Sequence, residues 1–107
     1  MYVRVHLLSL DPAKSRQIMR FTDEEVVPKY RDLPGFRRFT AAGDLAAGRA
    51  ITITEWDTRE QAQGHLTALD FGQETADIGI EIDAIYVYEV VAHTESVRPE
   101  RSAKHSS

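Results

Sequence analysis

The stretch that most constrains the fold of this chain runs from residue 50 to residue 71, because it joins a strand pattern directly to a helix pattern. Residues 50–56 (AITITEW) are β-branched and aromatic, which is typical of a largely covered strand. Thr58 can cap a helix, and Gln61 is placed to bond back to the Thr58 amide in a capping box. The stretch therefore predicts a strand that ends at Trp56 and a helix that follows at once.

The predicted helix carries a histidine on its apolar side. His65 shares a stripe of core spacing with Ala62, Leu66 and Leu69. One interpretation is a partly buried histidine that bonds to the backbone or to a threonine. The other is an acid, base or hydrogen-bond donor that faces a pocket, since an ordinary histidine pKa near 6.5 permits all three roles at neutral pH. Periodicity alone leaves both open.

A second histidine lies in the first strand. Residues 2–8 alternate in a way that predicts a strand with both faces largely covered. His6 is either a contact within the sheet or subunit interface, or a polar group in the same pocket as His65. The residues that share its face are Tyr2, Arg4 and Leu8.

A long helix is predicted after the first strand. Asp11-Pro12 supplies a cap and a first helical residue, and the apolar spacing continues to about residue 32. Pro28 should kink or break this helix near Val27, because it removes a backbone hydrogen bond and crowds the preceding turn. Tyr30 falls on the apolar side, where core packing and a pocket role both stay open.

Further strands are predicted at 36–42, 49–56 and 84–92. Simple alternation in the first of them places Phe36 and Arg38 on the face opposite Phe39. In the second, Glu55 points away from Trp56, and a carboxylate in a covered strand is costly unless it is paired. We therefore expect Glu55 to form an ion pair with an arginine or with a partner subunit. Trp56 is either an anchor beneath the second helix or an aromatic wall for a planar ligand.

The order of elements, β-α-β-β-α-β, predicts an α+β ferredoxin-like fold with an antiparallel sheet in a single domain over residues 1–93. Residues 94–107 are polar and lack a period, so we expect a flexible C-terminal tail. The helices cover one sheet face. The other face is also apolar and must be buried by something, and a second copy packed sheet to sheet would do so. The sequence thus predicts a homodimer.

Composition excludes several classes of function. With 13 basic and 17 acidic residues the net charge is −4, which argues against a nucleic-acid surface. There is no cysteine, and the histidines lack metal-ligand spacing, so no metal site is predicted. No apolar run approaches the roughly 20 residues that span a bilayer. The N-terminus lacks a signal-peptide pattern, so a cytoplasmic protein is expected.

The run EWDTREQAQGHLTALDF resembles a motif of the antibiotic biosynthesis monooxygenase superfamily, and Leu33-Pro34-Gly35-Phe36 resembles the turn before that superfamily's second strand. Together with the order of elements, the resemblance covers about residues 2–92. The residues that carry the longer motif are Glu55, Trp56, Ala62, His65 and Phe71.

The resemblance implies a dimeric α+β barrel and a monooxygenase that needs no cofactor, acting on a phenol, hydroquinone or anthrone-like molecule. In that reading His65 accepts or shares the phenolic proton, so that the electron-rich ring reacts directly with O2. The substrate-binding residues it implies are His6, Tyr30, Trp56 and Phe71.

Other readings stay open. A haem-degrading relative would have a tryptophan near the place of His65 and a ligand histidine about nine residues later, where this chain has Glu74. A dimer that binds a small ligand without turning it over, or a domain of the polyketide cyclase or isomerase type, remains an alternative.

Overall fold

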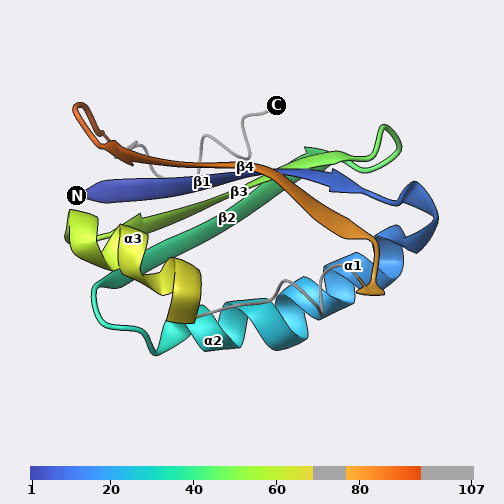
Figure 1. The fold of residues 1–107 in the computed structure, drawn as a ribbon, viewed down its shortest axis with the longest axis horizontal. Helices are drawn as coiled ribbons and strands as arrows, with labels where there is room; N and C mark the ends of the chain where they lie inside the picture. Colours follow the sequence, from blue (N-terminus) through green and yellow to red (C-terminus); the bar gives the residue numbers. More distant parts are fainter. Residues whose placement is uncertain (69–76, 95–107) are drawn as a thin grey trace, which may run out of the picture.

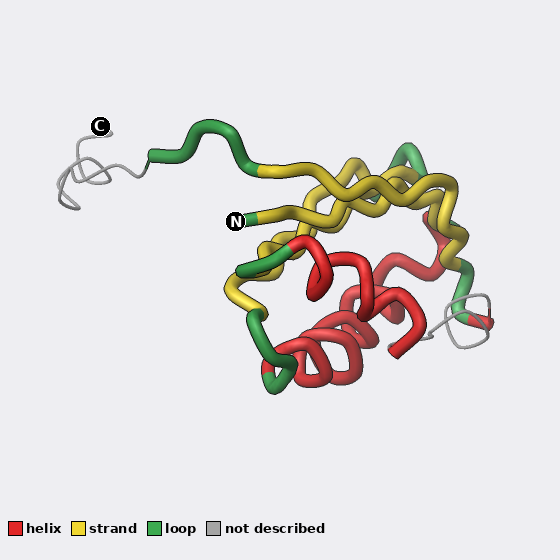
Figure 2. The backbone as a smooth tube through the Cα atoms, turned by 60° about the vertical axis from the view of Figure 1, so that its left-hand side comes forward, coloured by secondary structure: helices red, strands yellow, loops and turns green. Residues whose placement is uncertain are grey.

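The computed structural model describes residues 1–68 and 77–94, with side chains as far as Gly64 and again from Asp77. A four-stranded antiparallel sheet in the order β2-β3-β1-β4 forms one layer, and the helices pack on one of its faces (Figures 1 and 2). The predicted ferredoxin-like α+β fold is confirmed. Its elements are β1 (Tyr2–Leu10), α1 (Ser15–Phe21), α2 (Val27–Arg31), β2 (Phe36–Asp44), β3 (Arg49–Trp56), α3 (Arg59–Ala68) and β4 (Ile80–Glu89). Apart from Thr94, the predicted tail lies outside the described residues.

The first helical segment begins and breaks where its sequence indicates. The Asp11 side chain accepts a hydrogen bond of 3.0 Å from the Ala13 amide and so caps a short 3-10 turn before α1. Between α1 and α2 the backbone forms a π-helical turn at Thr22–Val26. Pro28 follows directly and has no amide hydrogen to donate to the preceding turn, so the wider turn accommodates it. The predicted interruption is confirmed, and it starts one turn earlier than Val27.

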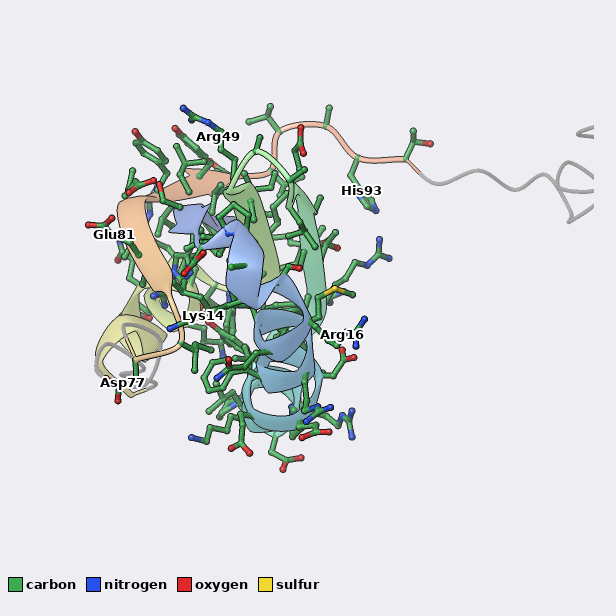
Figure 3. All side chains as sticks on the ribbon, turned by 90° about the vertical axis from the view of Figure 1, so that its right-hand side faces the viewer. Lys14, Arg16, Arg49, Asp77, Glu81 and His93 are labelled. Atoms are coloured by element: carbon green, nitrogen blue, oxygen red, sulfur yellow. The ribbon has the colours of Figure 1, made fainter. Side chains whose placement is uncertain are left out.

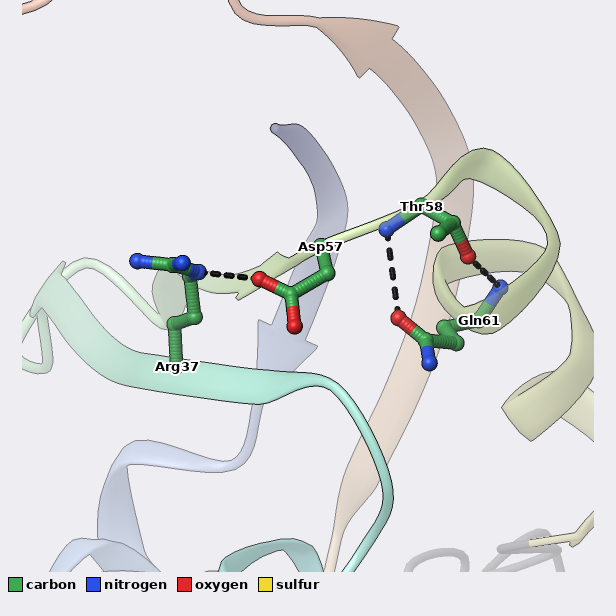
Figure 4. A network of polar contacts seen from close by, with 4 residues as sticks. All are labelled: Arg37, Asp57, Thr58 and Gln61. Atoms are coloured by element: carbon green, nitrogen blue, oxygen red, sulfur yellow. Dashed lines mark hydrogen bonds and ion pairs between the residues drawn. The ribbon is translucent and has the colours of Figure 1, made fainter.

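The capping box of α3 is also confirmed. The Thr58 amide donates to Gln61 Oε1 over 3.2 Å, and the Gln61 amide donates to Thr58 Oγ1 over 3.1 Å (Figure 4). Gly35 passes beside this box with a φ of 78°, and its carbonyl accepts from the Asp57 amide over 3.0 Å. The start of α3 is thereby tied to the turn that precedes β2.

A β-bulge in β2 changes which side chains face the helices. Phe36 pairs with Trp56 but Arg38 pairs with Glu55, so Arg37 is an extra residue without a partner position. The bulge resets the alternation, and Phe36 and Phe39 share the helix-facing side. The expectation that they lie on opposite faces is therefore wrong.

β4 begins and ends earlier than the predicted range of 84–92. Its first residues, Ile80–Ile82, pair with the end of β1 across a second bulge, and Glu89 pairs with Tyr2 at the start of β1. Beyond Glu89 only Met1 is left opposite, and its carbonyl accepts from the Val90 amide over 2.9 Å, so the ladder ends here although the sequence stays apolar.

The helix-facing side of the sheet holds two separate apolar clusters. The first, here called the α1 cluster, is built on Leu10, Ile18 and Ile80. The second, the aromatic cluster, is built on Tyr30, Trp56 and Ala62, with Phe36 and Phe39 packed against them. Centroids of contacting rings in the aromatic cluster lie 5.5 to 5.9 Å apart, within the range of favourable ring contacts.

The opposite, outer face of the sheet carries both the predicted ion pair and exposed apolar side chains. Arg38 Nε lies 3.6 Å from Glu55 Oε2, which confirms the expected arginine partner. Leu7, Tyr86 and Tyr88 are exposed, and the two tyrosine rings stack at 5.8 Å. The apolar outer face is present, while the predicted packing against a second copy stays a prediction.

Candidate functional site

A band of polar side chains crosses the helix-facing side of the sheet between the two apolar clusters. β1 and β3 are neighbouring central strands, and their register places Arg4 opposite Thr54 and His6 opposite Thr52. We call these four residues the polar belt. Polar groups in an interior need partners, so the hydrogen bonds of the belt define what it can bind.

Arg4 is the most deeply buried charged group of the belt, with 4% of its surface exposed. Its Nε donates to His6 Nε2 over 2.9 Å. Its Nη1 is buried and, among the residues that the structure describes, has no hydrogen-bond partner. Burying a cation without a partner is costly, so this nitrogen is the belt's candidate contact for a bound group.

His6 is held in its neutral form. Because Nε2 accepts a hydrogen bond from the guanidinium, the ring proton is on Nδ1. Burial, reinforced by the positive charge of Arg4, lowers the pKa of His6 from 6.5 to about 4. A general base works best with a pKa near the working pH, so His6 is a weak base at neutral pH. Its evident role in the belt is to orient Arg4.

Tyr30 and Trp56 stand behind the belt, inside the aromatic cluster. Burial raises the pKa of Tyr30, which α2 supplies, and the charge of Arg4 opposes that shift only in part. Tyr30 is therefore a neutral phenol at neutral pH. Trp56 is completely buried, and its indole N–H donates to Thr54 Oγ1 over 2.8 Å. The hydrogen bond to Thr54 thus links the polar belt to the aromatic cluster.

A cavity of about 300 Å³ lies on the other side of the belt, between α1 and the sheet. Its volume matches the lower end of the range for small-molecule sites, and its lining is mostly apolar. Thr52 of the belt forms part of the wall. The other polar wall residues are Thr22 and Asp23, and apolar ones include Leu8, Ile18, Met19, Ala41 and Ile80.

The structure brings three of the predicted site residues to the helix-facing side of the sheet: His6, Tyr30 and Trp56. His65 lies in α3, but its side chain is outside what the structure describes, as is the whole of Phe71. These five roles stay predictions.

Arg4 was not among the predicted site residues. The alternation that selected His6 places Arg4 on the same face, and a charged residue in a covered strand was the available signal. A charged side chain in a covered strand needs a partner, and this argument, which predicted a partner for Glu55, applies equally to Arg4.

Among the side chains described, those of residues 1–64 and 77–94, no group of three or more histidine, aspartate or glutamate residues is placed to hold a metal ion. In the same part of the chain no helix is long and apolar enough to cross a membrane.

Comparison with known proteins gives structural matches only: no protein-family model and no curated protein matches the sequence. An antibiotic biosynthesis monooxygenase superposes with a TM-score of 0.66 and 19% identity over 86% of this chain and 100% of the other. A monooxygenase from the ActVA-Orf6 gene of Streptomyces coelicolor, in complex with Nanaomycin D, has a TM-score of 0.63 and 15% identity over 89% of this chain and 92% of the other.

A third match is the haem degrader MhuD from Mycobacterium tuberculosis, with two haems bound in its active site. Its TM-score is 0.68, with 14% identity over 89% of this chain and 100% of the other. The chain therefore has the fold of the antibiotic biosynthesis monooxygenases, as its motifs suggested. At these identities the likeness shows the fold alone.

Proposed function

We propose that this protein is a monooxygenase that uses O2 without a cofactor and acts on a small aromatic phenol, hydroquinone or anthrone-like compound. The observation that carries the proposal is the largely apolar cavity of about 300 Å³ that adjoins the polar belt on the helix-facing side of the sheet. A fused aromatic ring suits such a cavity, and a polar belt at one end suits its oxygen substituent. The Streptomyces coelicolor monooxygenase of the same fold binds Nanaomycin D.

In the proposed reaction the substrate itself supplies the electrons. For an anthrone, the ring CH2 group and O2 give a ring carbonyl and water, so one oxygen atom enters the product and the other is reduced to water. The step requires an electron-rich, deprotonated substrate, and the proton must go to a base. His6 is a poor candidate because its pKa is about 4 and its Nε2 already accepts from Arg4.

We therefore propose His65, on α3, as the group that accepts the substrate proton. Its backbone lies one helical turn after Ala62, which is completely buried in the aromatic cluster. Phe71, Tyr30 and Trp56 are proposed to shape the ring pocket, and His6 to make a secondary polar contact.

We further propose that the protein is a homodimer joined through the outer sheet faces. The exposed apolar side chains Leu7, Tyr86 and Tyr88 support this, because an apolar patch of this kind is usually covered in solution. The test is sedimentation of the wild type against Tyr86→Asp and Tyr88→Asp. Separation of these variants into monomers is expected, and a wild type that is monomeric at micromolar concentration would refute the dimer.

Oxygen uptake tests the catalytic proposal. Purified protein treated with a chelator would be mixed with a panel of hydroquinones and anthrones, using wild type, His65→Ala and His93→Ala. His93 is an exposed histidine beyond β4 (Figure 3), so His93→Ala is the matched control. Catalysed uptake by wild type and control, lost in His65→Ala, is the expected result. Full activity in His65→Ala would contradict the assigned base.

Two other results would select other functions. Stoichiometric binding of a panel compound without uptake would indicate a ligand-binding or cyclase-type protein. A Soret band after addition of haem, together with haem loss in the presence of a reductant, would indicate the activity named for MhuD.

A further inference from the structure

Arg4 carries a positive charge that the described part of the chain does not balance. Only 4% of the surface of Arg4 is exposed, and no carboxylate among the described residues pairs with it. Burial lowers the pKa of Arg4, yet a guanidinium stays protonated at neutral pH. Among the described residues, the interior between sheet and helices therefore holds a cation without a paired anion.

The two polar neighbours of Arg4 do not supply the missing negative charge. His6 accepts a hydrogen bond from Arg4 Nε but is neutral. Protonation at low pH would make it positive, so it cannot supply a negative charge. Tyr30 acts electrostatically on Arg4, but burial raises the pKa of its phenol and keeps it un-ionised. The hydrogen bond to His6 orients the guanidinium without neutralising it, and Nη1 has no hydrogen-bond partner among the described residues.

The cavity reaches the polar belt at Thr52, while Arg4 and His6 lie behind its wall. Thr52 lines the cavity and sits directly opposite His6 in the sheet, while Leu8 lines it from β1, two residues beyond His6 on the same face. A ligand in the cavity thus has its apolar body over the α1 cluster and one end at the polar belt. The belt is where a polar substituent of that ligand belongs.

We propose that Arg4 is an anion-binding residue that receives the ionised oxygen of a ligand that extends from this cavity past Thr52 into the polar belt. The ligand class is an aromatic compound that carries a phenolate, an enolate or a carboxylate. The proposal rests on the proposed function in one respect, namely that a small aromatic compound occupies the cavity. Guanidinium–oxyanion hydrogen bonds are short and strong, and their strength grows where water is excluded.

His6 has a distinct part in this arrangement as a positioning residue. By accepting the Nε hydrogen it fixes the plane of the guanidinium and leaves Nη1 for the ligand. A neutral ligand of the same shape would leave the cation unpaired, so the site should discriminate by charge.

The test compares two ligands that differ in charge and little else. 2-Hydroxy-1,4-naphthoquinone is ionised at pH 7.5, whereas 2-methoxy-1,4-naphthoquinone has the same ring and cannot ionise. Affinities would be measured by titration calorimetry for wild type, Arg4→Met, Arg4→Lys and Arg49→Met. Arg49 is an exposed arginine whose pairing with Ser9 puts it on the outer face of the sheet (Figure 3), so Arg49→Met is the matched control.

Wild type and Arg49→Met are expected to bind the hydroxyquinone at least tenfold more tightly than the methoxyquinone. Arg4→Met should lose that preference by weakening only the hydroxyquinone, and Arg4→Lys, which keeps the charge, should retain part of it. The urea midpoint of Arg4→Met should equal or exceed that of wild type, since the variant removes an uncompensated buried charge.

Three results would overturn the proposal. They are an undiminished hydroxyquinone preference in Arg4→Met, a lowered midpoint or loss of folding in Arg4→Met, and a wild type that binds neither quinone at millimolar concentration. A lowered midpoint would make Arg4 a structural residue. Because the assay measures binding without turnover, its failure is independent of the oxygen-uptake result.

Discussion

Acidification should destabilise this protein through His6. The pKa of His6 is lowered from 6.5 to about 4 in the folded state by burial and by the charge of Arg4. As the pH falls below 6.5, the unfolded chain binds a proton at this ring and the native chain does not. The free energy of unfolding therefore falls with pH, and the contribution of His6 is complete above pH 6.5 and lost by about pH 4.

The size of the effect follows from the two pKa values. A difference of about 2.5 units, at 1.36 kcal/mol per unit, corresponds to about 3 kcal/mol between pH 7 and pH 4. Because the ring is only partly buried, solvent screening reduces this to about 2 kcal/mol. For a domain with a stability of roughly 5 to 15 kcal/mol, such a change is readily measured.

Urea unfolding of wild type and His6→Gln at intervals from pH 7.5 to pH 4 tests this. Glutamine can present Oε1 near the place of Nε2 and so accept the Arg4 hydrogen bond, but it does not titrate. The difference in stability between the two proteins should shift in favour of His6→Gln by about 2 kcal/mol as the pH falls. His93→Gln is the control, and its curve should follow that of wild type.

The reasoning would be refuted if wild type and His6→Gln lost stability in parallel over this range. A native-state NMR titration that placed the pKa of His6 at 6.5 or above would refute it directly. Either result would mean that the ring is free to take up a proton beside Arg4.

Other substitutions probe the packing described above. Trp56→Ala empties the centre of the aromatic cluster and should lower the free energy of unfolding by about 3–5 kcal/mol in urea; a loss under 1 kcal/mol would contradict the packing. Thr58→Ala removes the bond from the Gln61 amide and should cost about 1 kcal/mol, and the double variant that also carries Gln61→Ala should lose more, because the Thr58 amide then loses its acceptor as well. Gly35→Ala should lower the thermal midpoint because its φ is 78° and its Cβ would collide with Gln61, while Gly64→Ala, which meets open space in α3, should raise it. Thermal midpoints that move in the same direction in Gly35→Ala and Gly64→Ala would contradict this prediction.

Much of the fold was predictable because local signals agreed with the global order. The Asp11 cap, the Thr58–Gln61 box and the interruption at Pro28 are each fixed by neighbouring residues, and each is confirmed. The ion pair of Glu55 was predictable for a different reason, since a covered carboxylate requires a partner.

The errors arose where pairing between distant strands overrides local pattern. The bulge at Arg37 and the bounds of β4 depend on what β3 and β1 offer opposite them, which no period within the strand encodes. The site was predicted in outline only. His6 drew notice because histidine suggests chemistry, whereas Arg4 became visible once its burial and missing partner were known.

The division of the interior by the polar belt has a consequence for cooperativity. Among the described residues, the α1 cluster and the aromatic cluster share no buried side chain, and the residues between them contribute hydrogen bonds. Amide hydrogen exchange should therefore resolve two units in the free protein. The free energy of opening measured at the amides of α1 should be lower than that at the amides beside Trp56. A ligand that fills the cavity and reaches the belt would touch both units, and their exchange rates should then fall together.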